Sequence, residues 1–119
     1  IDGKILGKPA NRAEASEMLH MLSGRDHHVC TGIAIIDNET QKSYCGFERT
    51  VVHFRHLTDD EIIKYINTGE PMDKAGAYGI QNIGALFVEN IKGDYFNVVG
   101  LPLCKLGQVL KEEFGYELF

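Results

Sequence analysis

Cysteine is scarce in this sequence, and the few cysteines do not have the spacing of a disulfide or zinc framework. Cys30, Cys45 and Cys104 are odd in number and form no CxxC pair, and no histidine accompanies them at zinc-finger spacing. A disulfide scaffold and a structural zinc are therefore not indicated. We expect these thiols to be reduced and mostly buried.

Long apolar runs are absent as well. No stretch approaches the roughly 20 apolar residues of a membrane-spanning helix, and no signal peptide is visible. Repeats, low-complexity segments and linkers are also missing, so the sequence predicts one domain over residues 1–119. It predicts a cytoplasmic protein without a membrane partner.

Positive charge is in deficit. The sequence has 12 lysines and arginines against 17 aspartates and glutamates, which gives a formal charge of −5 at pH 7. Proteins that coat nucleic acid or anionic membranes have the opposite balance, so we expect no nucleic-acid partner. A local basic pocket can still hold a phosphate ligand. The hydrophobic share of 44% is ordinary for a domain that buries a core.

The first residues look like a chain that is cut inside a hairpin. Asp2-Gly3 is a dipeptide typical of hairpin turns, but only Ile1 precedes it, and the sequence does not open on methionine. Two explanations stay open. Residues were lost to proteolysis or disorder, or the sequence is the C-terminal part of a longer protein.

Two capping boxes predict helices, one near the start and one in the middle of the chain. In each, an N-cap residue stands three positions before a glutamate, and apolar residues at helical spacing follow until a glycine. The first box is Asn11 and Glu14, followed by Ala15, Met18, Leu19 and Leu22 up to Gly24, and the second is Thr58 and Glu61, followed by Ile62, Ile63, Tyr65 and Ile66 up to Gly69. A last helix begins at Pro102, with its apolar side formed by Leu103, Leu106, Val109, Leu110 and Phe114.

Two adjacent strands, residues 28–37 and 42–54, are predicted by runs of β-branched and apolar residues around a polar turn. In the second strand Glu48 and Thr50 share one face. They could bind a metal or a ligand hydroxyl, or they could simply be solvated on an edge strand. Residues 85–91 and 95–99 predict a further hairpin, so the sequence indicates an α/β or α+β domain.

One nine-residue stretch, DKAGAYGIQ (residues 73–81), combines two glycines and two alanines with an acid, a base, an aromatic ring and an amide. Small residues allow a close backbone approach, and glycine also permits positive φ. Two interpretations stay open. The stretch is a loop against a ligand, or its small residues pack a helix against a sheet.

Other polar residues have a functional and a structural interpretation. Lys8, between Gly7 and Pro9, could present its ammonium to a phosphate from a fixed loop, or it could be a solvated loop lysine. His27 follows the end of the first predicted helix, where the helix dipole favours a cation. No serine or cysteine stands in a nucleophile elbow, so covalent catalysis has no support.

The sequence contains four motifs in succession: DGKILGKP, MLSGRDHHVCTGIAI, FERTVVHF and GEPMDKAGAYGIQNIGALFVENIKGDYFNVVGLPL. In this order and spacing they resemble the Maf-like family of nucleoside triphosphate pyrophosphatases, once described as septum-formation inhibitors. The resemblance implies an elongated α/β fold with a two-lobed mixed sheet flanked by helices, similar to the inosine triphosphatase group. It also implies a hydrolase that cleaves a nucleotide between its α and β phosphates, with a divalent metal, Mg²⁺ or Mn²⁺, as cofactor.

The same resemblance implies motifs that these residues do not contain. Family members carry a serine- and arginine-rich SxSPRR-type motif, a glutamate and an Ala-Asp-Thr motif upstream of DGKILGKP, and the aspartate is the general base. We therefore expect the catalytic aspartate upstream of Ile1, and we expect this chain to be the C-terminal portion of a Maf-like domain. Residues 1–119 alone should then be inactive or nearly so.

Residue by residue, the resemblance implies that Lys8 binds phosphate and that Gln81 contacts the base. Glu48, Thr50 and Lys74 would be further substrate-binding residues in the cleft, with Asp73 pairing with or orienting Lys74. It assigns no metal ligand within the chain. The resemblance is also compatible with a homodimer.

The YGIQ sequence at Gln81 resembles the family branch that acts on dTTP and UTP. A glutamine amide offers both a donor and an acceptor, which suits a uracil or thymine edge, whereas a glutamate would suit the donors of guanine. We expect hydrolysis of dTTP or UTP, or of modified pyrimidine nucleotides, to the monophosphate and pyrophosphate. A non-catalytic nucleotide-binding protein that affects division or septum formation is the alternative, and a structural interaction domain is a third.

Overall fold

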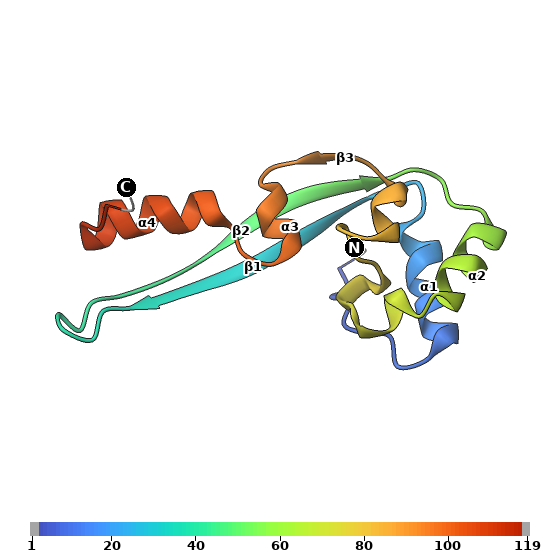
Figure 1. Cartoon of the computed structure of the whole chain (residues 1–119), viewed down its shortest axis with the longest axis horizontal. Helices are drawn as coiled ribbons and strands as arrows, with labels where there is room; N and C mark the ends of the chain where they lie inside the picture. Colours follow the sequence, from blue (N-terminus) through green and yellow to red (C-terminus); the bar gives the residue numbers. More distant parts are fainter. Residues whose placement is uncertain (1–2, 118–119) are drawn as a thin grey trace. The chain divides into compact units, whose positions relative to one another are not determined.

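The computed structural model of the chain describes residues 3–117, and its elements confirm the mixed α/β class (Figure 1). In chain order the elements are α1 (Arg12–Leu22), β1 (Asp26–Ile36), β2 (Ser43–Phe54), α2 (Asp59–Asn67), the 3-10 turns η1 (Glu70–Asp73), η2 (Ala75–Ala77) and η3 (Ile83–Phe87), β3 (Val88–Lys92), α3 (Tyr95–Val99) and α4 (Leu103–Phe114). The strands form a three-stranded sheet in the order β1-β2-β3. None of the described helices is long and apolar enough to cross a membrane.

Two compact units can be told apart. One contains the residues up to His28 together with Val51–Ile91, and the other contains Val29–Thr50 and the residues from Lys92 on. The strands β1 and β2 contribute to both units. The expectation of one domain over residues 1–119 stays a prediction.

In the first unit, both predicted helices begin at the predicted caps. The Asn11 side chain accepts a hydrogen bond from the Glu14 amide (2.9 Å), and the Glu14 carboxylate accepts one from the Ala10 amide (3.2 Å). Thr58 and Glu61 form the complete reciprocal box, with both bonds at 3.1 Å. Each cap stabilises its helix by roughly 1 kcal/mol, because it satisfies a backbone N–H that has no partner within the helix.

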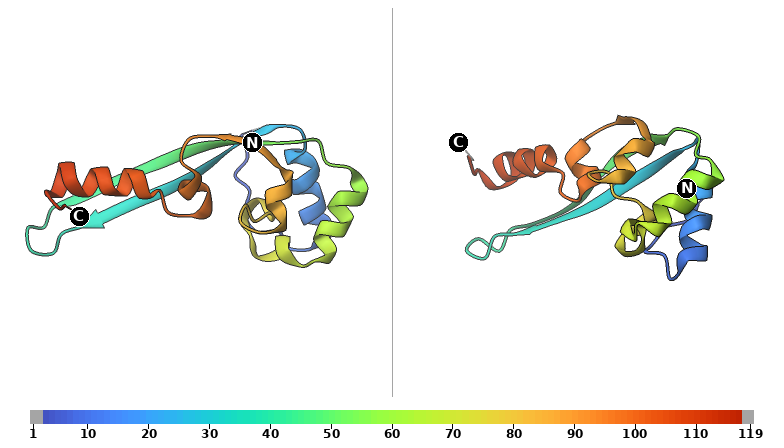
Figure 2. Two further views of the ribbon diagram at one scale, coloured as in Figure 1. Left: turned by 45° about the horizontal axis from the view of Figure 1, so that its top comes forward. Right: turned by 45° about the vertical axis from the view of Figure 1, so that its right-hand side comes forward.

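The helices α1 and α2 pack side by side (Figure 2). The buried residues of α1 are the four predicted ones, and α2 buries Ile62, Tyr65 and Ile66. The end of β2 adds Val52 and Phe54, which are both fully buried. These buried residues form the apolar core of the first unit, and α1 also contacts η1 and η2, which carry part of the candidate site.

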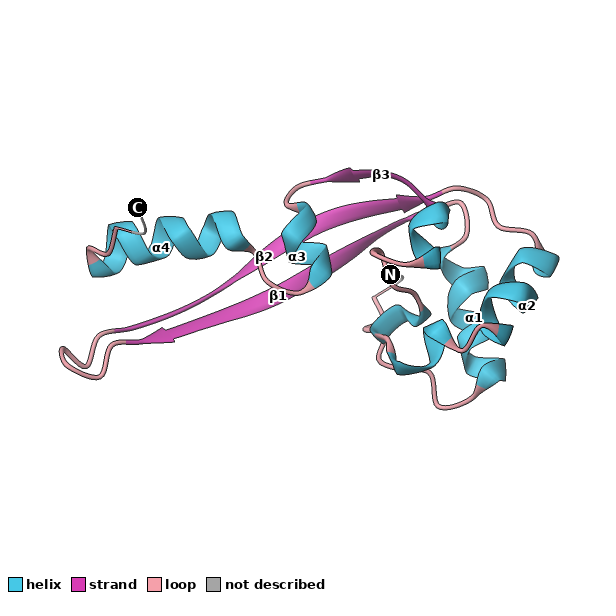
Figure 3. Cartoon of the chain, in the orientation of Figure 1, coloured by secondary structure: helices cyan, strands magenta, loops and turns pink. Residues whose placement is uncertain are grey.

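In the second unit, the predicted strand at residues 95–99 is wrong, because this segment is the short helix α3 (Figure 3). The Asp94 side chain caps it by accepting a hydrogen bond from the Phe96 amide (2.8 Å). The Thr50 hydroxyl in turn donates to the Asp94 carbonyl oxygen (2.9 Å). These bonds stabilise the start of a helix at residue 95. The predicted hairpin partner of β3 is therefore missing, and β3 pairs with β2 instead.

A buried asparagine ties α3 to the two long strands of the second unit. The Asn97 amide nitrogen lies 3.0 Å from the Val29 carbonyl oxygen and 3.1 Å from both the Glu48 carbonyl oxygen and the Thr50 hydroxyl. The Thr31 hydroxyl donates to the Asn97 carbonyl oxygen (3.1 Å). Asn97 is fully buried, and these bonds fix α3 against the two strands.

The last helix and all three cysteines belong to the second unit. The helix α4 follows Pro102 as predicted and ends at Gly115, which has the left-handed conformation common at helix ends. The cysteines are free, in line with the prediction of reduced thiols, but all three are exposed, so the expectation that they are mostly buried is wrong.

Candidate functional site

Two loops of the first unit meet at the predicted phosphate-binding lysine. The Gly76 amide donates a hydrogen bond to the Gly7 carbonyl oxygen across 3.1 Å, which joins the GKP loop to the DKAGAYGIQ segment. Pro9 is buried and restricts the backbone of the GKP loop, while Lys8, between Gly7 and Pro9, is exposed. The structure thus places Lys8 on a loop that is bonded directly to the segment after Lys74.

The segment at residues 75–77 has an unusual backbone. Gly76 has φ of 77° and Ala77 has φ of 67°, and both residues are buried. A non-glycine residue in this left-handed region costs roughly 1–3 kcal/mol and persists only where its surroundings determine it. The contacts around η2 therefore hold its backbone in one conformation next to the GKP loop.

The second glycine of the segment makes room for a lysine. A Cβ atom on Gly79 would lie 2.6 Å from Cε of Lys74, so the Lys74 stem covers this glycine. The Lys74 ammonium lies 3.5 Å from the Asp73 carboxylate, which is the pairing that we expected. Gly79 therefore lets the chain approach the protein's own Lys74, and not a sheet, while its contact with a nucleotide stays a prediction.

A carboxylate that the sequence analysis did not single out organises the rest of this loop. Glu70 accepts hydrogen bonds from the amides of Ile83 (3.1 Å) and Gly84 (3.0 Å) and from the Tyr65 hydroxyl. The Tyr65 hydroxyl accepts one from the Gly79 amide (3.2 Å). The two amides lie 13 and 14 residues after Glu70 in the sequence, so local pattern gave no signal of this role.

Gln81 lies within this loop and is exposed. It therefore belongs to the same unit as Lys8 and Lys74. Its amide is accessible to a ligand, as a base-contacting residue requires, and its role stays a prediction.

Glu48 and Thr50 belong to the second unit. Thr50 is fully buried on the middle strand of the sheet, so the interpretation of Thr50 as solvated on an edge strand is wrong. Its hydroxyl is engaged with Asp94 and Asn97. Glu48 is half-buried, and its carboxylate accepts a hydrogen bond from the Arg49 amide (3.2 Å). A substrate-binding role for these two residues stays a prediction.

His27 is buried, so its interpretation as a cation near a helix end is wrong. Its Nε2 lies 2.7 Å from the Tyr78 hydroxyl, and its ring stands edge-on to Phe54 and Tyr78 at centroid distances of 5.1 and 5.4 Å. Burial lowers the pKa of His27 to about 4, so the ring is neutral at pH 7. The histidine thus contacts Tyr78 of the DKAGAYGIQ segment as part of an aromatic cluster.

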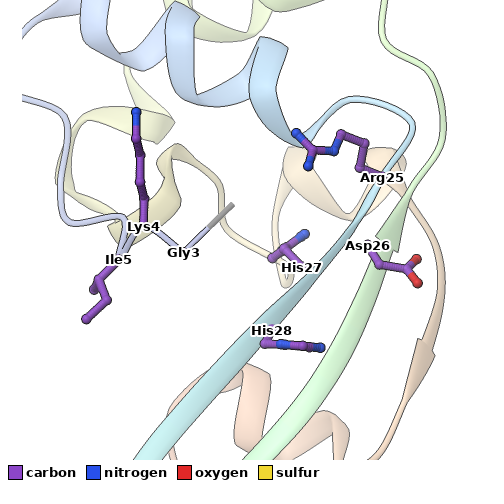
Figure 4. Close-up of a pocket in the computed structure, with 7 residues that line it drawn as sticks. All are labelled: Gly3, Lys4, Ile5, Arg25, Asp26, His27 and His28. Carbon is purple, nitrogen blue, oxygen red and sulfur yellow. The ribbon is translucent and has the colours of Figure 1, made fainter. Parts of the chain in front are cut away.

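A hollow of about 440 Å³ lies beside His27 in the first unit (Figure 4). Its lining comes from the segment Gly3, Lys4 and Ile5 and from the residues Arg25, Asp26, His27 and His28. In Figure 4 Asp26 and His28 project from one face of β1 and His27 from the other. None of the five predicted substrate-binding residues lines this hollow.

A protein-built metal site is not evident in residues 3–117. Among them, no group of three or more histidine, cysteine, aspartate or glutamate side chains could hold a metal ion. The described residues therefore form no cluster that could hold the implied divalent metal without further ligands, such as the oxygens of a bound substrate.

Comparison with known proteins identifies the family. The family model described as "Maf-like protein" matches residues 1–113. A "dTTP/UTP pyrophosphatase" of Alkaliphilus oremlandii is 58% identical over 97% of this chain and 60% of its own length. Proteins of the same name from Caldanaerobacter subterraneus and Alkaliphilus metalliredigens are 56% and 53% identical, over 56% and 59% of their own lengths. The chain thus spans about 60% of the length of these curated relatives, and it belongs to the Maf-like family.

Proposed function

We propose that the protein hydrolyses dTTP and UTP to the nucleoside monophosphate and pyrophosphate. The observation that carries the proposal is the similarity to relatives of that name, which covers 97% of the chain at 58% identity in one case. The matched residues include both the GKP loop and the DKAGAYGIQ segment, which the bond between Gly76 and Gly7 holds together. In this reaction water adds to the α phosphorus, the bond from that phosphorus to the oxygen bridging to the β phosphorus breaks, and pyrophosphate leaves.

Lys8 would act on the charge of the phosphates. The lysine is exposed on a loop whose backbone is fixed by Pro9 and by the bond from Gly76. A cation held in place near the phosphoryl oxygens stabilises the negative charge that is spread over them in the transition state. Lys74 lies in the neighbouring loop and would add a second cation.

Gln81 would read the base. Its amide presents one donor and one acceptor, which can pair with the carbonyl and the N–H of a uracil or thymine edge. As the general base we propose the aspartate of the Ala-Asp-Thr motif that the family resemblance implies.

A divalent metal remains part of the proposal as a cofactor that the substrate helps to hold. Mg²⁺ usually keeps several waters and is bound by one or two carboxylates together with substrate phosphates. A cluster of three protein ligands is therefore not needed for it to act. When bound, the metal would neutralise phosphate charge.

The finer expectations about location and partners have the same standing. We propose a cytoplasmic protein that binds nucleotides and not nucleic acid. The net charge of −5 supports the absence of a nucleic-acid partner. A homodimer and a role in septum formation stay predictions.

The test uses the protein expressed from its whole reading frame. Pyrophosphate and orthophosphate released from dTTP, UTP, GTP and ATP would be measured separately, with Mg²⁺, with Mn²⁺ and with a chelator. We expect pyrophosphate from dTTP and UTP in preference to the purine nucleotides, and its loss on chelation. Release of orthophosphate alone, or no release from any nucleotide while nucleotides bind, would overturn the proposal in favour of another reaction or a binding protein.

A further inference from the structure

The loop that carries Gln81 is closed at its base. A Cβ atom on Gly84 would lie 2.5 Å from the carbonyl oxygen of Gly79 and 2.9 Å from the Tyr65 hydroxyl, so the two ends of the loop are in direct contact. Within it, the Asn82 amide donates to the Gly79 carbonyl oxygen (3.4 Å), and the Ala85 amide donates to the Asn82 carbonyl oxygen (3.0 Å). Gln81 lies inside the turn that the Asn82 to Gly79 bond closes, so its position depends on how the ends of the loop are held.

Glu70 and Tyr65 hold both ends together. Glu70 accepts the first two amides of η3, from Ile83 and Gly84, which lack a side-chain cap from Asn82. Tyr65 accepts the Gly79 amide at the other end and donates its own proton to Glu70. One carboxylate and one hydroxyl thus fasten the loop on either side of Gln81.

The protonation state of Tyr65 is well defined. Burial of Tyr65, together with its bond to Glu70, raises the pKa of the phenol, so the hydroxyl keeps its proton. Its single proton goes to Glu70, which leaves the oxygen free to accept from Gly79. The ring is fixed as well, because Tyr65 is 2% exposed and packs edge-on against Phe87 at 4.8 Å.

We infer that Glu70 and Tyr65 are positioning residues for Gln81 and thereby help to set the preference for a pyrimidine base. The inference rests on the proposed function, because it needs a nucleotide whose base meets Gln81. Neither residue contacts the substrate in this account. Their loss should change which base is accepted more than it changes the reaction at the phosphates.

The test compares Glu70→Gln and Tyr65→Phe with the parent in the protein from the whole reading frame. In Glu70→Gln an NH2 group replaces one of the two carboxylate oxygens. This group cannot accept a hydrogen bond from the Ile83 or Gly84 amide that it faces, so one bond to the loop is lost. Tyr65→Phe keeps the ring packing and removes only the hydroxyl. We expect the ratio of kcat/KM for UTP to that for GTP to fall about tenfold in Glu70→Gln and severalfold in Tyr65→Phe, since recognition of a polar edge depends on a fixed partner.

A matched control separates positioning from stability. Asn11→Ala removes the cap of α1 in the same unit and should lower stability by a similar amount, but it should leave the UTP to GTP ratio unchanged. KM and kcat are reported separately, and the fall should appear mainly in KM for UTP. If Glu70→Gln does not fold, Tyr65→Phe decides the question by the same ratio.

The outcomes distinguish this inference from the function on which it rests. If Gln81→Glu changes the ratio while Glu70→Gln and Tyr65→Phe do not, the positioning role is wrong and the proposed function stands. If the Asn11→Ala control changes the ratio as much as Glu70→Gln, the effect is one of stability and the inference is also wrong. If the protein releases no pyrophosphate from any nucleotide, the proposed function itself fails.

Discussion

The Gly76 amide donates a hydrogen bond to the Gly7 carbonyl oxygen, with the two atoms 3.1 Å apart. This contact joins segments that are about half the chain apart in sequence and places Lys8 beside the loop of Lys74. Gly76 has the left-handed φ of 77° that glycine adopts readily at such a turn. The DKAGAYGIQ segment thus uses one glycine for this turn, and it uses Gly79 to accommodate the Lys74 side chain.

Lys8→Ala should lower turnover of UTP by about a hundredfold, because it removes a fixed cation from the phosphates. The free energy of unfolding should stay within about 1 kcal/mol of the parent, since the exposed side chain contributes little to folding. Steady-state kinetics and denaturant unfolding check the two halves. Lys111→Ala, an exposed lysine of α4, is the matched control and should change neither. A loss of stability with unchanged turnover would make Lys8 a structural residue.

Gln81→Glu should shift the preference away from pyrimidines. The new carboxylate would face a carbonyl acceptor of uracil, and such a mismatched contact costs roughly 1–3 kcal/mol, or about ten- to a hundredfold in kcat/KM. GTP should be affected less or should gain. The measurement is the ratio of kcat/KM for UTP and GTP in parent and variant. An unchanged ratio with a uniform loss of rate would mean that Gln81 supports the loop and does not read the base.

Acid should destabilise the protein partly through His27. Burial lowers its pKa from the ordinary 6.5 to about 4 on folding, so the unfolded state binds more protons between these values. Stability attributable to His27 is therefore complete above pH 6.5 and is lost as the pH falls toward 4, by at most about 1.4 kcal/mol per pH unit.

The check on His27 is denaturant unfolding of the parent and His27→Gln between pH 7 and pH 4. His20, whose pKa is raised mainly by its hydrogen bond to Asp59, changes stability in the opposite sense and is present in both proteins. The difference between the two proteins therefore isolates His27. The variant should lose less stability in acid, and equal losses would contradict the burial of a neutral ring.

Gly84→Ala should destabilise the protein by roughly 1–3 kcal/mol, because an added methyl group in a packed site forces neighbouring atoms to move. The new methyl group would meet the Gly79 carbonyl oxygen at 2.5 Å. Gly7→Ala is the control, since a Cβ there has nothing within 4 Å, and it should stay within about 0.5 kcal/mol. Thermal or denaturant unfolding compares the two. Equal stability of both variants would show that the loop is not closed as described.

Elements whose signals are local could be predicted from the sequence. The caps at Asn11 and Thr58 bind amides three residues away, and apolar residues recur behind them at helical spacing, so both helices begin where expected. The segment at residues 95–99 could not be assigned in this way. Its apolar pattern suits a strand, and it is helical because Asp94 is held by Thr50 from another part of the chain.

The candidate site divides along the same line. Lys8, Lys74 and Gln81 are predicted as site residues from motifs, and the structure adds the backbone contacts that fix their loops. The roles of Glu70 and His27 depend on tertiary partners, namely amides 13 and 14 residues away and an aromatic cluster. No local spacing encodes such contacts.

The most direct test of the central claim is the fate of solvent oxygen during hydrolysis of UTP. The protein from the whole reading frame would be incubated with UTP in water enriched in a heavy oxygen isotope, and both products would be analysed by mass spectrometry. Attack at the α phosphorus predicts that the label enters UMP and that the pyrophosphate carries none. Label in the pyrophosphate, or UDP and orthophosphate as the products, would contradict the account.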